Sequence, residues 1–339
     1  MKQTNCHFSR TPLPEDKFVL RLHLEPPIRK PEYKAERKRH LTVCIAAICE
    51  HNLIVGASDR MLTAHTVRDV VEFEPARTST GANFTFKVTP INSTQSIAMM
   101  MAGDSDIQAE IVLRMMRFIE ALEKQSPRKH WSVEEAVNLY IDFYNQIKAR
   151  RAASAILAPL NLDSDTFIKR QREMLDSFAE TIGRGLMEFP MPGVETIITG
   201  IDDFGPHLYV LAGNEPRCCD AIGFAAIGIG ASHAELQFML RGYTRIVPQE
   251  EALWLTYMAK RKSEIAPGVG KITDLFRIGG TGKCKYQSLN DLFDKMQLDK
   301  IYADFEARQS CAFQEAHETL KRLLEKIVAE RKRNPPDQP

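Results

Sequence analysis

Three polar side chains flank a pair of apolar runs near residue 50, and their types could support acid–base or nucleophilic chemistry. Thr42 comes directly before the apolar run Val43–Cys49, and a second run ends in Asp59-Arg60. The polar segment Glu50–Asn52 between the runs suits a turn between two paired strands. A threonine hydroxyl is a poor nucleophile at neutral pH, so it needs a group that takes its proton. The pattern predicts a buried hairpin that carries a hydroxyl, a carboxylate and a guanidinium.

This stretch resembles the opening of a proteasome β-type subunit, which is an N-terminal nucleophile (Ntn) hydrolase. In that family a threonine begins the first strand and a D-S-R-like motif closes the second, matched here by SDR at 58–60. Further along the chain, AG at 102–103 matches the family's A-G motif. The segment GIDDFGPHLY at 200–209 resembles its G-x-D-x-x-G-P-x-L-Y hairpin. The resemblance covers roughly residues 42–278.

The resemblance implies a catalytic site without metal or cofactor. Thr42 matches the family's nucleophile, whose free α-amine has a pKa of about 8 and serves as the base. Lys87 matches the catalytic lysine, whose charge lowers the pKa of that amine, and Asp59 matches the carboxylate that fixes the lysine's charge. A backbone N–H near Gly103 matches the oxyanion donor.

Four features depart from the family pattern. In an ungapped alignment Ser58 takes the place of the acidic residue, and a one-residue bulge could bring Asp59 into that place. Ile229, within GIG at 228–230, replaces a serine expected beside the nucleophile, and a later aspartate is missing near Ala266. Leu41 precedes the threonine, where self-cleaving members have glycine. These departures weaken the case for activity more than the case for the fold.

Simpler interpretations of the same residues stay open. Thr42 can be an ordinary strand-opening threonine, which β propensity favours. Lys87 lies in an alternating segment typical of a solvated strand edge, and Asp59-Arg60 can be a surface ion pair of little stabilising value. Two classes of function therefore remain. One is a proteasome-like threonine hydrolase that cleaves peptide or other amide bonds, and the other is a non-catalytic scaffold or assembly protein in which Thr42 stays internal.

Periodicity predicts the elements that position these residues. Strand-like runs occur at 43–49, 53–57, 84–91, 96–102, 195–201, 207–210, 224–229 and 272–278. Helical spacing occurs at about 107–122, 133–147, 166–187, 232–240, 248–259 and 305–328, with Ser/Glu capping boxes at 132/135 and 232/235. This order predicts an α+β fold, a four-layer αββα sandwich of two stacked antiparallel sheets as in Ntn hydrolases.

The chain divides into three expected regions. Residues 1–41 are proline-rich and basic toward their end, which is typical of an N-terminal extension: a propeptide, an arm, or a segment upstream of a start at codon 41. Residues 42–300 form the proteasome-like domain, with a helical insertion at about 150–190 that the family lacks. Residues 301–339 form a C-terminal helix and a polar tail.

Composition argues against several other classes. Lys and Arg number 45 against 44 Asp and Glu, so a formal charge of +1 provides no field for nucleic acid or an anionic membrane. The seven cysteines include no CxxC pair, and no apolar run has the length of a membrane span or a signal peptide. The segment GGTGK at 279–283 lacks the Walker spacing. We expect a cytoplasmic protein with no nucleic-acid or membrane partner.

Apolar surface beyond the need of one subunit predicts a homo-oligomer, ring-like as in the resembled family. It comes from the insertion at about 150–190 and from one face of the helix Phe313–Val328. The expected substrate is a peptide or protein.

Overall fold

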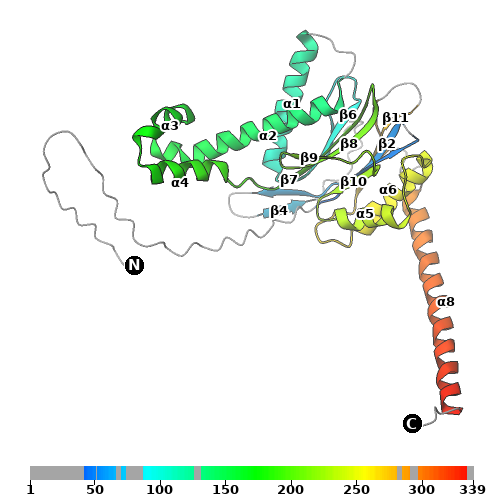
Figure 1. Cartoon of the computed structure of the whole chain (residues 1–339). Coiled ribbons are helices and arrows are strands. Elements are labelled where there is room, and N and C mark those ends of the chain that lie inside the picture. Colours follow the sequence, from blue (N-terminus) through cyan, green and yellow to red (C-terminus); the bar gives the residue numbers. More distant parts are fainter. Residues whose placement is uncertain are drawn as a thin grey trace, which may run out of the picture. The chain divides into compact units, whose positions relative to one another are not determined.

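The computed structural model describes residues 42–50, 52–65, 70–73, 87–125, 131–280, 285–290 and 297–333. These residues form a mixed α+β unit in which two antiparallel sheets are stacked (Figure 1). The extension expected at 1–41 and residues 84–86 of an expected strand lie outside the described residues.

The first sheet is built around the predicted hairpin. β1 (Cys44–Cys49) and β2 (Leu53–Asp59) are antiparallel, with Cys49 opposite Leu53. The strand order is β10 (Phe224–Ile227), β1, β2, β11 (Thr273–Gly279) and β12 (Tyr286–Ser288). Every residue of β1 and β2 is buried, because both strands have neighbours on either side and packing on both faces. This explains why their sequences are continuously apolar rather than alternating.

The second sheet contains the segment next to Lys87. Its order is β5 (Val88–Pro90), β6 (Ile97–Gly103), β7 (Val194–Asp202), β8 (Gly205–Ala212) and β9 (Glu215–Cys218), and all neighbours are antiparallel. The prediction that Lys87 lies within a strand is wrong, because it occupies the bend directly before β5. β9 was missed because all four of its residues are exposed, so burial imposes no alternation on them. A separate hairpin pairs β3 (Leu62–His65) with β4 (Val70–Phe73).

Alternation along the strands divides the core into layers. Cys44 and every second residue after it pack with Ile197 of β7 in the core between the sheets. Ile45 and its alternates face α5 and α6, whereas Ile198 of β7 faces α1 and α2. The helices span α1 (Ser105–Gln125), α2 (Val133–Ile156), α5 (Ala231–Leu240) and α6 (Gln249–Ser263). Helices therefore cover the outer face of each sheet, which is compatible with the predicted sandwich (Figure 1).

Side chains cap the starts of α1 and α2. Asp104 accepts a hydrogen bond from the Ile107 amide at the start of α1 (3.1 Å). Ser132 and Glu135 form the predicted capping box of α2, each side chain accepting a bond from the other residue's backbone amide.

The capping box predicted at 232/235 is wrong. α5 begins one residue earlier, with Gly230 at the N-cap and no side-chain cap. The Gly230 and Ala231 amides bond to the carbonyls of Thr42 and Gly228, and these bonds fix where the helix begins. The Glu235 side chain is then free to take part in other interactions.

The insertion forms a small helical subdomain. After α2 the chain forms η1 (Ala158–Leu160), α3 (Ser164–Arg170), η2 (Gln171–Glu173) and α4 (Asp176–Met187). The prediction of one continuous helix at 166–187 is therefore wrong. Phe167 of α3 and Ile182 of α4 pack together with Leu157 in their own apolar cluster, against which Met174 also packs. A bend at Met174 separates the two helices, and each of them buries an apolar residue in this cluster.

The C-terminal helix α8 (Leu298–Arg333) begins earlier than predicted. Leu298 and Tyr302 pack against Tyr257 of α6, and the Tyr257 hydroxyl donates to the Asp299 carboxylate (2.6 Å). The first turns of α8 thus belong to the core of the main unit.

Candidate functional site

Thr42 and Asp59 meet at the open end of the hairpin. Thr42 lies two residues before Cys44, on the side of β1 that faces the second sheet, and it is buried. Antiparallel pairing places Cys44 opposite Ser58, and the Asp59 amide donates to the Val43 carbonyl (3.2 Å). The end of β2 therefore lies directly beside the start of β1.

Asp59, rather than Ser58, contacts the threonine. Its Oδ1 accepts from the Thr42 hydroxyl and from the Val43 amide (3.2 Å), and its Oδ2 accepts from the Gly270 amide (2.7 Å). Ser58 points elsewhere, and its buried Oγ has no hydrogen-bond partner among the described residues. Both oxygens of the aspartate are therefore engaged, and the register of β2 is continuous through Ser58 and Asp59, so the bulge considered from the sequence is absent here.

Lys87 reaches the same point from the other sheet. Its Nζ donates to Thr42 Oγ1 and lies 2.6 Å from Asp59 Oδ1. Its side chain is only 5% exposed, and the Asp59 side chain is fully buried. The simpler interpretation of Lys87 as a solvated residue at a strand edge is therefore wrong. The interpretation of Asp59 as part of a surface ion pair is also wrong. The predicted group of hydroxyl, ammonium and carboxylate is brought together in a site shielded from water, where electrostatic interactions are strengthened.

Gly103 lies at the end of β6, paired with Val194. In the described part of the chain its amide is not among the donors to Thr42, so its role as an oxyanion donor stays a prediction. Two other glycine amides contact the site instead. Gly230 N donates to the Thr42 carbonyl (3.3 Å), and Gly270 N donates to Asp59. Neither glycine was predicted to contact the site, although both belong to closely spaced glycine pairs, GIG at 228–230 and GVG at 268–270.

Gly228 packs directly on the Thr42 main chain. It has φ of 88°, and a Cβ added there would lie 2.3 Å from the Thr42 carbonyl oxygen. Only glycine fits at this distance and in this backbone conformation. Ile229, next along the chain, packs partly buried against the apolar cluster of α5 and α6. The site therefore lacks a hydroxyl at the position where the resembled family has serine.

The C-terminal end of α6 holds both glycine loops in place. Ser263 Oγ donates to the Gly230 carbonyl (3.1 Å), and Lys260 Nζ donates to the Lys271 carbonyl (2.9 Å) and to Glu264 (2.7 Å). Ser263 and Lys260 are fully buried, and burial lowers the pKa of Lys260 although Glu264 opposes this effect. These contacts were not predicted, because no local pattern distinguishes a buried lysine on an amphipathic helix from an exposed one.

Cys44 lies beside the site but does not compete with Thr42 as a nucleophile. Its Sγ donates to the Met101 carbonyl (3.7 Å), and burial raises the pKa of the thiol to about 12 even though Lys87 lowers it. The thiol therefore stays protonated at neutral pH, and it is the thiolate that attacks electrophiles.

A second buried ion pair lies next to the site without touching the threonine. Arg60 Nε donates to Asp274 Oδ1 (2.8 Å), and Asn290 donates to the same oxygen (2.8 Å). Both charged side chains are almost fully buried. Arg60 thus ties β2 to β11 instead of forming the surface pair that the sequence allowed.

Comparisons with known proteins assign no family. A scan against models of protein families finds no match to this chain. A search among curated proteins also finds no similar sequence. The function is therefore inferred from the residues of the site and their geometry.

Two further features bear on the kind of site. Within the described ranges, no three or more His, Cys, Asp or Glu side chains are grouped so that they could hold a metal ion. Among the helices that the structure describes, none combines the length and apolar character needed to cross a membrane.

Proposed function

We propose that this protein is a threonine hydrolase with an Ntn-type αββα fold, acting on peptide or other amide bonds. The observation that carries the proposal is the convergence of Lys87 Nζ and Asp59 Oδ1 on the hydroxyl of Thr42. Asp59 ends β2 of the first sheet and Lys87 directly precedes β5 of the second, and both are buried together with Thr42. Burying a lysine and an aspartate is unfavourable unless they are paired, so their presence beside a hydroxyl favours a catalytic arrangement.

The proposed reaction uses the α-amine of Thr42 as the base. Thr42 Oγ1 attacks the carbonyl carbon of the scissile amide while its proton passes to the α-amine. The amine then donates that proton to the leaving nitrogen, so the C–N bond breaks and an ester with Thr42 forms. Water hydrolyses the ester, which releases the acid and restores the hydroxyl. The Lys87 charge disfavours the protonated amine and stabilises negative charge near Oγ1, and Asp59 holds that lysine in place.

This mechanism requires a free amine on Thr42. In the full chain the Thr42 nitrogen is joined to Leu41, and an amide nitrogen cannot accept the proton. A version that begins Met-Thr42, from which the methionine is trimmed, should react with a peptide boronate or epoxyketone, and intact mass should show one adduct. The full chain should stay unmodified unless it processes itself, which a new N-terminus at Thr42 would reveal. Unmodified protein in both cases would contradict the hydrolase and favour the non-catalytic scaffold.

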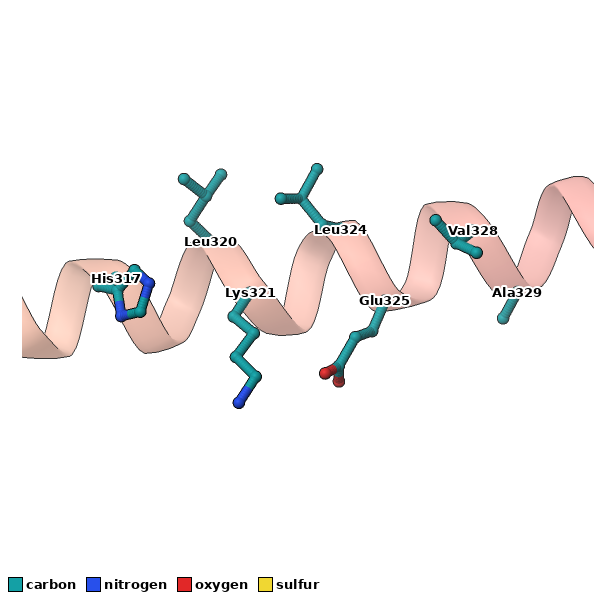
Figure 2. A pocket seen from close by; sticks show the side chains of 7 residues that line it. All are labelled: His317, Leu320, Lys321, Leu324, Glu325, Val328 and Ala329. Carbon is teal, nitrogen blue, oxygen red and sulfur yellow. The ribbon is translucent and has the colours of Figure 1, made fainter.

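We also propose that the protein assembles through α8. From Phe313 onward its large apolar side chains are about half exposed or more, including Leu320 (54%), Leu324 (53%) and Val328 (52%). A shallow hollow along this helix is lined by α8 residues alone, and Figure 2 shows Leu320 and Leu324 extending from the same side. Such an apolar stripe on a water-soluble helix is typical of a contact surface.

The expected result is a homo-oligomer in light scattering at micromolar concentration. The variant Leu320→Lys/Leu324→Lys should lower the particle mass measured by light scattering. Assembly would bury two charges in the contact between subunits, which is unfavourable. The matched variant Glu318→Gln/Arg322→Lys, on the same helix but outside that hollow, should keep the assembly. A monomer of 38.4 kDa for the wild-type chain would contradict this expectation.

A further inference from the structure

A mixed cavity opens beside the Thr42 main chain, away from the Lys87 contact. Its volume is about 760 Å³, and it lies between the β7–β9 side of the second sheet and the turn from β10 into α5. The residues that line it are Glu195, Val210, Ala212, Glu215, Pro216, Arg217, Ala226, Ile227, Gly228, Ile229, Ala231, Ser232 and Glu235. This volume is within the range of small-molecule and side-chain binding pockets.

The cavity borders the candidate site at Gly228. This glycine lines the cavity and lies so close to Thr42 that a Cβ would be 2.3 Å from its carbonyl oxygen. Glu195 bridges the two sheets at this point, because its Oε2 accepts from the Gly228 amide (2.7 Å). Gly228 therefore forms both a wall of the cavity and a contact of the Thr42 main chain.

The side chains that line the cavity carry an excess of negative charge, which favours a cationic ligand. Glu195, Glu215 and Glu235 are set against a single cation, Arg217, so three negative charges and one positive charge leave a net charge of −2. Glu235 is partly buried, and burial raises the pKa of its carboxyl, although the Ala226 amide and Arg217 oppose this effect. A cationic ligand in the cavity would stabilise the ionised carboxylates further.

The apolar part of the lining fits the same kind of ligand. Val210, Ile227 and Ile229 line the cavity together with the carboxylates. Lysine and arginine side chains combine an alkyl stem, which packs on apolar surface, with a terminal cation that pairs with carboxylates.

We propose that this cavity binds the positively charged side chain, of the lysine or arginine type, of an amide substrate presented to Thr42. The inference rests on the proposed hydrolase function and adds a substrate class to it. Glu215 and Glu235 are the specificity-determining residues, and Glu195 orients the Gly228 wall.

Binding to the full chain tests this proposal without any reaction. Fluorescein-labelled Ala-Ala-Lys-Ala-Ala should bind roughly tenfold more tightly than the same peptide with norleucine, as measured by fluorescence anisotropy, because the charged hydrogen bonds are lost. The double variant Glu215→Gln/Glu235→Gln should bind the two peptides equally. The matched variant Glu188→Gln/Glu318→Gln, which removes two exposed carboxylates elsewhere, should keep the preference.

Each result has a defined meaning. Equal affinity of the wild-type chain for both peptides overturns the proposal, and so does a lysine preference that survives in the Glu215/Glu235 variant. If that double variant fails to fold by circular dichroism, Glu215→Gln alone, at an exposed strand position, provides the same comparison. Failure of Thr42 to react with the boronate would instead contradict hydrolysis and leave the binding result standing.

Discussion

Replacing Thr42 with alanine in the version that begins Met-Thr42 is expected to abolish modification by a peptide boronate or epoxyketone. The hydroxyl is the atom on which Lys87 and Asp59 converge, and the neighbouring Cys44 thiol is kept protonated by burial, so it should not take the place of the hydroxyl. Intact-mass spectrometry should show the adduct in the wild type only. Peptide mapping should place it at residue 42.

The fold should survive this change. Lys87 and Asp59 keep their mutual contact (2.6 Å) without the hydroxyl, so the lost hydrogen bonds should lower the free energy of unfolding by only about 1 kcal/mol. The matched variant Thr42→Ser retains a hydroxyl and should still react. Equal modification of the wild type and of Thr42→Ala would remove Thr42 as the nucleophile.

The variant Asp59→Asn is expected to lose both reactivity and stability. Asparagine keeps the shape but removes the negative charge, so the Lys87 ammonium would remain buried without its counter-charge. Breaking a buried ion pair in this way lowers the free energy of unfolding by about 3–5 kcal/mol. Because the lysine would no longer be held against Thr42, the rate of modification should fall by at least about 100-fold.

Asp274→Asn is the matched control for Asp59→Asn. Asp274 is also fully buried and paired, with Arg60, and it lies on the neighbouring strand opposite Ser58. Its loss should reduce stability in urea unfolding to a similar extent, yet leave the rate of Thr42 modification close to that of the wild type when both proteins are folded. Equal rate losses in the two variants would mean that Asp59 acts only through stability.

The sequence by itself determined the elements whose signals are local. The hairpin of β1 and β2 followed from two apolar runs joined by a short polar turn, because complete burial requires apolar residues at every position. The start of α2 followed from a reciprocal Ser132–Glu135 cap, which acts over only three residues. These features depend on backbone preferences and on burial patterns that can be recognised from a few neighbouring residues.

Local signals failed where distant contacts outweigh propensity. The capping box expected at 232/235 did not form, because the Gly230 amide bonds to the Thr42 carbonyl far away in the chain and sets the start of α5. The expected helix at 166–187 divided in two, because Phe167 and Ile182 both pack on one cluster. In both places a tertiary contact stabilises a geometry that the local sequence does not prefer.

Only the tertiary structure decided which polar residues form the candidate site. Sequence spacing could not choose between Ser58 and Asp59, since adjacent residues on a strand point to opposite faces and a shift of one reverses their roles. The structure brings Asp59 to Thr42 and leaves Ser58 without a partner among the described residues. Lys87, which precedes a three-residue strand, is identified by its reach across the space between two sheets. Stacking of the sheets creates that contact, and no periodicity within either strand encodes it.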